Sequence, residues 1–292
     1  MGLQPARCVF QQGLSRARLS DMPALLLKSL LFVLLSGLWT LLPQGVLAQT
    51  AVDLELVLAV DVSLSMDMDE QRLQRDGYVQ ALRDPEVQKA IASGPNGRIA
   101  ITYMEWAGPP SQTVVIPWTI IDSPAAAQAF ADKLEAAPIS RARMTSISAA
   151  LSFSKSLLAS SGVRGIRRVI DVSGDGPNNA GFTVTGIRDE LINDGIVING
   201  LPIVLKRSNS WSMFDLEHLD RYYTDCVIGG TGAFMIPIRD PGEFKTATRR
   251  KLLLEISGLE TPARVIRAQV TETMDCSVGE RQWRRYLDGT PN

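Results

Sequence analysis

The stretch from Leu54 to Asp69 constrains the fold of this chain more than any other. Its residues from Leu56 to Val60 are all apolar, and the run ends abruptly in the pattern Asp61-x-Ser63-x-Ser65. An unbroken apolar run is typical of a strand that is covered on both faces, as in the centre of a parallel sheet. The sequence therefore predicts a central strand that places one aspartate and two serines where the chain leaves the sheet.

These three polar side chains stand at alternate positions, so a turn can point them at one place above the carboxyl end of the strand. Open α/β sheets bind their ligands in that crevice. Carboxylate and hydroxyl oxygens are hard donors, which suit Mg²⁺ or Ca²⁺ rather than Zn²⁺. Asp and Ser are also common in turns and helix caps, so the pattern alone leaves a purely structural role open.

The first 48 residues have the features of a secretory signal. Basic residues precede or enter the apolar run Ser29–Leu42, Pro43 breaks this run, and small residues end at Ala48. We expect cleavage there and a periplasmic or secreted protein, and translation from Met22 would give a signal of more usual length. The alternative is an uncleaved inner-membrane anchor over residues 24–46, although the apolar run is shorter than the roughly 20 residues of a spanning helix.

Without this signal the chain keeps 26 basic and 30 acidic side chains, a net charge of about −4. This balance gives no electrostatic support for binding nucleic acid. Cys8 leaves with the signal, and Cys226 and Cys276 remain. Two cysteines in an exported protein most simply form one disulfide, which would tie the C-terminal tail to the sheet.

Helical and strand patterns alternate along the rest of the chain. Helices are expected over residues 69–82, 85–92, 124–137, 147–158, 182–193, 213–222 and 241–257, and strands over residues 98–106, 113–118, 167–172, 196–205, 225–228 and 233–238. The strand 113–118 follows 98–106 as a hairpin, and Pro117 is tolerable there at a sheet edge. The pattern predicts an α/β fold, a doubly wound and mostly parallel sheet flanked by helices, with one antiparallel edge strand. One domain spans residues 52–258, and residues 259–292 form a C-terminal extension.

Two further loops carry candidate metal ligands. The polar and basic segment Ile139–Met144 leads to Thr145 at the start of a helix, where a plain N-cap is the structural alternative. The strand 167–172 runs into Gly174-Asp175-Gly176, so a second strand delivers an aspartate to a loop at its end. The two glycines allow the backbone to bend sharply there.

Taken together, Asp61 to Ser65, Thr145 and Gly174 to Gly176 resemble the metal-ion-dependent adhesion site of von Willebrand factor type A (vWA) domains. The order, spacing and structural context of these three segments agree with that family. Within the superfamily the chain is similar to a bacterial group of exported A-like domains. The resemblance implies a Rossmann-like fold and a bound divalent cation, Mg²⁺ or alternatively Ca²⁺ or Mn²⁺.

The resemblance also implies a role for each of the five residues. Ser63 and Ser65 would bind the metal through their hydroxyls, Thr145 directly or through water, and Asp61 and Asp175 directly or through bound waters. Three neutral hydroxyls leave a divalent ion with spare Lewis acidity and an open position. In related domains an acidic side chain of a partner protein fills that position. We therefore expect a binding protein rather than an enzyme, with a protein partner that presents Asp or Glu.

Asp67 and Asp69 follow the two serines and raise the question of a second metal. In integrin β subunits, acids in a similar place help to hold a second ion beside the first. Here Met68 stands where that pattern has another Asp, and acids are also favoured at the amino end of a helix. We expect the structural role for both acids.

Catalysis is the alternative class of function. A Ser-His-Asp triad would need His218, the single histidine, to leave an amphipathic helical segment and reach Ser63. A Mg²⁺-dependent phosphoryl-transfer enzyme or hydrolase would use Asp61 as nucleophile, but such chemistry normally has a second Asp where this chain has Ser63 and Ser65. A structural vWA fold with an unused site is the remaining alternative.

The tail mixes basic and aromatic side chains. They are Arg281, Trp283, Arg284, Arg285 and Tyr286. We interpret them as a solvated helix face, or as a contact with the membrane surface or a partner.

Overall fold

The computed structural model describes residues 49–205, 216, 218–258 and 273–289. The predicted signal, residues 1–48, lies outside this range, as does part of the predicted C-terminal extension. The strands are β1 (Thr50–Asp61), β2 (Ile99–Trp106), β3 (Gln112–Ile121), β4 (Val163–Gly174) and β5 (Val197–Pro202). The helices are α2 (Met68–Arg83), α3 (Pro85–Ala92), α4 (Pro124–Ala136), α5 (Ile147–Ala159), α6 (Val184–Asn193), α7 (Leu219–Tyr222), η3 (Tyr223–Val227), η4 (Pro241–Glu243), α8 (Phe244–Ser257) and α9 (Val278–Leu287). Within the described ranges, no helix combines the length and the apolar character needed to cross a membrane.

The strands of the described chain form one sheet with the order β3-β2-β1-β4-β5. β1 lies between two parallel neighbours, so that Leu56 stands opposite Ile101 on β2 and Val169 on β4. β5 is parallel to β4, whereas β3 is antiparallel to β2 and forms the edge. The mostly parallel sheet and its one antiparallel edge strand are confirmed. The carboxyl ends of β1 and β4 therefore lie side by side at the same edge of the sheet.

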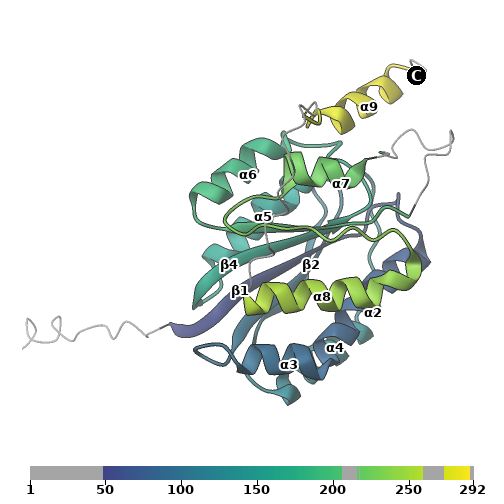
Figure 1. Cartoon of the computed structure of the whole chain (residues 1–292). Helices are drawn as coiled ribbons and strands as arrows, with labels where there is room; N and C mark the ends of the chain where they lie inside the picture. Colours follow the sequence, from purple (N-terminus) through teal and green to yellow (C-terminus); the bar gives the residue numbers. More distant parts are fainter. Residues whose placement is uncertain (1–48, 206–215, 217, 259–272, 290–292) are drawn as a thin grey trace, which may run out of the picture. The chain divides into compact units, whose positions relative to one another are not determined.

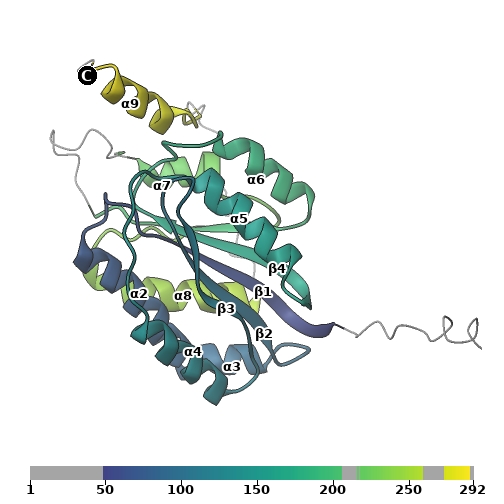
Figure 2. The ribbon, with the colours of Figure 1, turned by 180° about the vertical axis from the view of Figure 1, so that it is seen from behind.

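Helices cover both faces of the sheet. Helices α2, α3, α4 and α8 lie on one face, and α5, α6 and α7 lie on the other, as both views show (Figure 1, Figure 2). Each face has its own buried apolar cluster, and β1 supplies alternate side chains to both of them. This is the doubly wound arrangement that right-handed crossovers between parallel strands produce.

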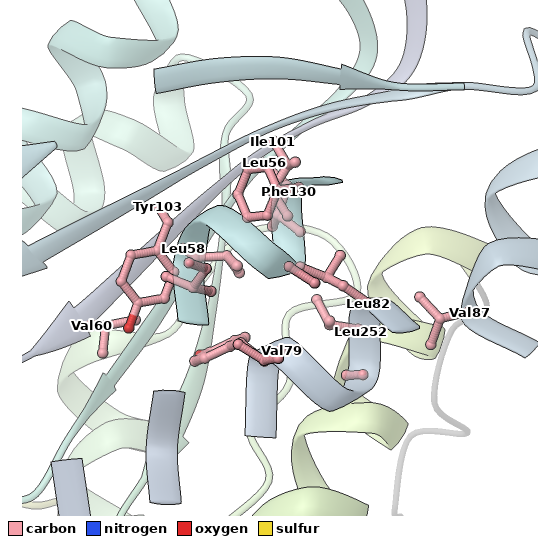
Figure 3. Close-up of a cluster of buried hydrophobic side chains, with 14 of the residues drawn as sticks. Leu56, Leu58, Val60, Val79, Leu82, Val87, Ile101, Tyr103, Phe130 and Leu252 are labelled. Carbon is pink, nitrogen blue, oxygen red and sulfur yellow. The ribbon is translucent and has the colours of Figure 1, made fainter. Parts of the chain in front are cut away.

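The apolar run of β1 anchors the core. Leu58 and Val60 point toward the α2 side, where they meet Tyr103 of β2 and side chains of α2 and α4 (Figure 3). Burial of each such aliphatic side chain is worth about 1.5–3 kcal/mol, so this strand fixes the sheet order more firmly than any local propensity does. Leu73 of α2 has the spacing of a core residue but is 36% exposed, because the adjoining α2 positions face the sheet instead.

Buried charges stabilise two helices against the sheet. Arg75 of α2 pairs with Glu105 of β2, and both side chains are almost completely buried. On α8, the buried Lys251 lies 2.7 Å from the carboxylate of Asp171 on β4 and also pairs with Glu255. Removing one member of such a group leaves a buried charge without a partner, which typically costs about 3–5 kcal/mol.

The segment after β5 differs from the sequence-based prediction. Residues 225–228 do not form a strand: Tyr223–Val227 is a π-helical turn that continues α7. Residues 233–238 make only isolated bridges, from Met235 to Gly200 and from Ile238 to Ile203, rather than a strand. Short apolar runs suit a strand or a buried turn equally well, and here the burial of Cys226 and Val227 against the α5 side selects the helical turn.

Candidate metal site

The loop after β1 joins the first three candidate ligands in one chain of hydrogen bonds. Asp61 ends β1 and is fully buried, and its Oδ1 accepts a hydrogen bond of 2.7 Å from the backbone N–H of Ser63. The hydroxyl oxygens of Ser63 and Ser65 lie 2.8 Å apart. Ser65 then donates to Oδ1 of Asp175 at 2.6 Å. Since Asp175 follows β4, four of the five predicted ligands meet where two adjacent strands end.

Gly174 makes this meeting possible. A Cβ atom at this position would lie 2.8 Å from Oδ2 of Asp61 and 3.1 Å from the hydroxyl of Tyr223. Any side chain there would push against the Asp61 carboxylate, so only glycine lets the ends of β1 and β4 approach this closely.

Thr145 lies against the same loop from the other side. Its N–H donates to Oδ1 of Asn179 at 2.9 Å, and its carbonyl accepts from the N–H of Asn179 at 2.8 Å. Its Oγ1 is 4.0 Å from the place of a Cβ on Gly176, directly after Asp175. The N-cap of α5 is Ser146, whose hydroxyl accepts from Ala149, so the alternative that Thr145 is a plain N-cap is wrong.

Met144 holds the loop before Thr145 in a strained conformation. Its φ angle is 73°, in the left-handed region, and it is the one non-glycine residue of the described chain with a positive φ. The flanking backbone is clamped, because Gly108 donates to the carbonyl of Arg143 and Ser146 donates to that of Ala107. Left-handed backbone costs an L-residue about 1–2 kcal/mol, and such strain is concentrated at functional sites.

The electrostatics of Asp61 set this carboxyl apart. Burial, followed by the nearby negative charge of Asp175, raises its pKa well above the usual value. Within the described chain no hydrogen-bond donor reaches its buried Oδ2. A buried carboxylate oxygen that lacks a donor costs free energy unless a cation compensates it.

The donor set fits a hard divalent cation. No group of three or more His, Cys, Asp or Glu side chains in the described ranges is placed to hold a metal. A cation at this site would therefore depend on the serine and threonine hydroxyls beside two carboxylates. Such an all-oxygen set suits Mg²⁺ or Ca²⁺.

Asp67 and Asp69 have structural roles, as expected. Asp67 is the N-cap of α2, and its carboxylate accepts from the N–H groups of Asp69 and Glu70. The backbone N–H of Asp67 in turn donates to Oε2 of Glu70. Asp69 forms an exposed ion pair of 2.9 Å with Arg72. Both acids are explained by the start of the helix.

Sequence reasoning missed the residues that hold the loops together. Asn178 is completely buried, and its Oδ1 accepts from the N–H of Ser148 on α5, beside the bonds that Asn179 makes to Thr145. Asn178 and Asn179 closely follow the Gly174–Gly176 segment. In turns, the side-chain amide of asparagine commonly forms hydrogen bonds with backbone groups. No sequence pattern indicates that Tyr223 belongs to the site. It lies near Asp61 because α7 and η3 pack against the end of β1.

His218 lies exposed in the turn before α7. The predicted disulfide is present: Cys226 of η3 is bonded to Cys276, and their Cα atoms are 5.4 Å apart. The C-terminal segment that carries α9 is thereby tied to the α5 side of the molecule.

The sheet order, the helices on both faces and the loops at the carboxyl ends of β1 and β4 define a von Willebrand factor type A (vWA) fold. A family model described as "Protein of unknown function (DUF1194)" matches residues 51–260. The chain belongs to that family. No curated protein matches the sequence.

Solved structures with a similar fold include a bacterial adhesin. The open conformation of the pilus adhesin SpaC from Lactobacillus rhamnosus GG matches 72% of this chain and 30% of its own, with 13% identity and a TM-score of 0.52. A von Willebrand factor type A protein from Catenulispora acidiphila matches 70% of this chain and 43% of its own, at 14% identity and a TM-score of 0.48. Proximal thread matrix protein 1 from the mussel byssus, in a structure "with zinc occupied MIDAS motif", matches 72% of this chain and 49% of its own, at 13% identity and a TM-score of 0.48. The chain thus spans less than half the length of each of these three proteins.

Proposed function

We propose that this protein binds a divalent cation, Mg²⁺ in the first place, through Asp61, Ser63, Ser65, Thr145 and Asp175, and that the cation holds a protein partner by an Asp or Glu side chain. The hydroxyls of Ser63 and Ser65 would contact the metal directly, and that of Thr145 directly or through water, without neutralising its charge. The carboxylates of Asp61 and Asp175 would balance part of its charge, directly or through water. When bound, the cation supplies a Lewis-acidic position for a carboxylate.

One observation carries this proposal, the buried Oδ2 of Asp61, which no hydrogen-bond donor in the described part of the chain reaches. The same carboxylate is close to that of Asp175, and its Oδ1 accepts from Ser63, the first residue of the Ser63–Ser65–Asp175 hydrogen-bond chain. Protein interiors rarely leave such an atom uncompensated. A divalent cation would remove both penalties, the missing donor and the repulsion between the two carboxylates.

The exposure of the site supports binding to a macromolecule. Ser65 is exposed, and Leu64 between the two serines is 47% exposed. Exposed apolar surface next to polar groups is typical of protein interfaces. Catalysis by Asp61 as a nucleophile is less well supported, because that side chain is fully buried and its neighbours in the loop are serines.

We further propose that the protein is exported by residues 1–48, with an uncleaved anchor over residues 24–46 as the alternative. The Cys226–Cys276 disulfide supports an oxidising compartment such as the periplasm. Mass spectrometry of the mature amino terminus tests this: a chain that begins at Gln49 agrees with cleavage, and an intact leader contradicts it.

Thermal unfolding and titration calorimetry with Mg²⁺, Ca²⁺ and Mn²⁺ test the metal site. We expect heat of binding and a rise in Tm for the wild type, because a ligand that binds only the folded state stabilises it. Asp61→Asn should lose both effects and, in chelator, should be at least as stable as the wild type, since it removes a buried uncompensated charge. The matched control is Asp69→Asn, an exposed acid eight residues later, which should behave as the wild type.

Absence of heat and of stabilisation with all three ions would refute the metal site. If the site is present, capture from cell extract on the immobilised protein, with and without chelator, tests the partner. We expect a partner that is retained with Mg²⁺, released by chelator and absent on Asp61→Asn. A partner that is retained equally by that variant would bind elsewhere.

A further inference from the structure

A groove of about 640 Å³ lies between α9 and three loops of the vWA fold. Trp283 and Arg284 of α9 form one side, and Pro109, Pro110, Met144 and Asn179 belong to the loops that form the other. The volume is in the range of sites that enclose a ligand side chain or small molecule. The groove uses the tail residues whose basic and aromatic mixture the metal site does not explain.

The α9 side of the groove is fixed to the rest of the protein. The buried Asn178 donates through Nδ2 to Oε1 of Glu280 at 2.8 Å. Gly279 packs so closely that a Cβ there would lie 2.2 Å from the carbonyl oxygen of Asn178. The disulfide from Cys226 to Cys276 ends two residues before α9 begins. Contacts of this kind indicate a preformed wall, which lowers the entropic cost of binding.

The groove shares two of its loops with Thr145 of the candidate metal site. Met144, which lines it, directly precedes Thr145 in the chain. Asn179, which also lines it, exchanges two backbone-directed hydrogen bonds with Thr145. A peptide that places a carboxylate on the cation therefore has the groove next to the loop of Thr145, within reach of its neighbouring residues.

The chemistry of the groove indicates what it receives. Trp283, Pro109 and Met144 offer apolar surface, while Arg284 is exposed at the rim and Arg143 is exposed beside Met144. The Glu280 carboxylate also lines the groove, and the neutral amide of Asn178 that donates to it adds no charge to offset it. Arg284 and Arg143 outnumber this one carboxylate, so the charge around the groove favours an acidic segment, and the apolar lining suits a bulky apolar side chain.

Phe182 supports an interface at this place. It stands between Gly181 and Thr183, two lining residues of the groove, and it is 89% exposed. Its loop is ordered, because Asn178 donates to the carbonyl of Phe182 at 3.0 Å. Next to the apolar lining of the groove, this side chain adds exposed aromatic surface on which a partner can pack.

We propose that the groove binds a bulky apolar side chain of the same acidic partner segment whose carboxylate is held by the cation. This inference rests on the proposed function and specifies its partner. The partner presents an extended segment with an Asp or Glu and, within a few residues, an aromatic or large aliphatic side chain. The cation and the groove are then two halves of one binding surface.

A panel of synthetic hexapeptides tests the inference in the presence of saturating Mg²⁺. Each peptide carries one Asp and, one to four residues away, either Phe or Ala, and binding is followed by NMR chemical-shift titration. We expect the Phe peptide to bind at least fivefold more tightly than the Ala peptide at one spacing or more. Trp283→Ala should remove this advantage and leave the affinity of the Ala peptide and of Mg²⁺ unchanged.

The matched control is Ile166→Ala, which alters a side chain that is 64% exposed near the opposite end of β4 and should keep the Phe advantage. Equal binding of Phe and Ala peptides, with Mg²⁺ still required, would overturn the groove and leave the metal-dependent function intact. No Mg²⁺-dependent binding of any Asp peptide would overturn both. Dimerisation that Trp283→Ala abolishes would show that a second copy of the chain fills the groove, which also overturns the inference.

Discussion

Met144 shows how a single residue sets the geometry of the Thr145 loop. The surrounding hydrogen bonds force it into left-handed backbone, which glycine adopts freely and a β-branched residue adopts at high cost. We expect Met144→Gly to stay within about 1 kcal/mol of the wild type, because relief of strain offsets the greater freedom of the unfolded chain. Met144→Val should be destabilised by a further ~1–2 kcal/mol. Urea unfolding measures both, and equal stability of the two variants would contradict the strain.

The residues of the candidate site differ in how far sequence reasoning could find them. Asp61, Ser63 and Ser65 stand at alternate positions directly after the apolar run of β1, so the sequence pattern identifies them. They meet Asp175 because β1 and β4 are neighbours in the sheet and end at the same edge. Thr145 was predicted at the right place but with a competing cap role, which falls to Ser146.

At the scale of elements, the ion pair between α2 and β2 also positions the loop that leads to Thr145. Arg75 donates to the carbonyls of Ala137 and Pro138, and Glu105 accepts from the N–H of Ser140 at 3.2 Å. We expect Glu105→Leu to lower the free energy of unfolding by about 3–5 kcal/mol, because it leaves the Arg75 charge buried without its partner. The double variant Arg75→Met/Glu105→Leu should lose much less. Chemical unfolding of the four proteins of this cycle gives the coupling, and additive losses would contradict it.

The buried charges of α8 predict a pH dependence of stability. Burial would lower the pKa of Lys251, but Asp171 and Glu255 raise it, so the ammonium stays charged between two carboxyls. The single positive charge of Lys251 cannot balance two negative charges, those of Asp171 and Glu255. Burial and the charge of Asp171 raise the pKa of Glu255 to about 7. Since this pKa is higher in the folded than in the unfolded state, the stabilisation is fully present below about pH 4.5 and is lost as the pH rises through 7.

We therefore expect this group to lower the free energy of unfolding by about 1 kcal/mol per pH unit as the pH rises from 5 to 7. Glu255→Gln should flatten this slope, and the control Glu190→Gln, an exposed acid paired with Lys155, should keep it. Urea unfolding at several pH values compares the three proteins. Identical slopes for the wild type and Glu255→Gln would contradict the assignment.

The prediction of elements succeeded where periodicity and caps agreed. The helices predicted over 69–82 and 85–92 correspond to α2 and α3, which begin at aspartate caps. The prediction failed after β5, where strands were expected over 225–228 and 233–238. Burial of Cys226 in a π-helical turn and its bond to Cys276 are tertiary facts that no local pattern contains.

At the scale of the whole molecule, the disulfide decides whether the C-terminal segment belongs to the fold. It closes a loop of 50 residues and ties α9 to η3. Replacement of both cysteines by serine should lower the free energy of unfolding by up to about 4 kcal/mol, the chain-entropy limit for such a loop. It should also increase hydrogen exchange in α9, while β1 remains protected. Unchanged exchange in α9 would show that the contacts of Asn178 suffice to hold it.

The fold class of the molecule followed from one strand. The apolar run Leu56–Val60 of β1 requires two parallel neighbours and helices on both faces, and these requirements leave few topologies. The docking of α9 on the loop after β4 did not follow, because it depends on Asn178 and on close approach at Gly279 rather than on any periodic pattern.

The order of the strands along the chain has a consequence for making pieces of this protein. β1 leaves the ribosome first, but β2 begins at Ile99 and its other neighbour, β4, only at Val163. In a fragment that stops before Val163, one edge of β1 therefore has unpaired backbone N–H and C=O groups beside an apolar run. Exposed strand edges of this kind promote aggregation. Both edges of the central strand β1 can be paired only after synthesis has reached Gly174, where β4 ends.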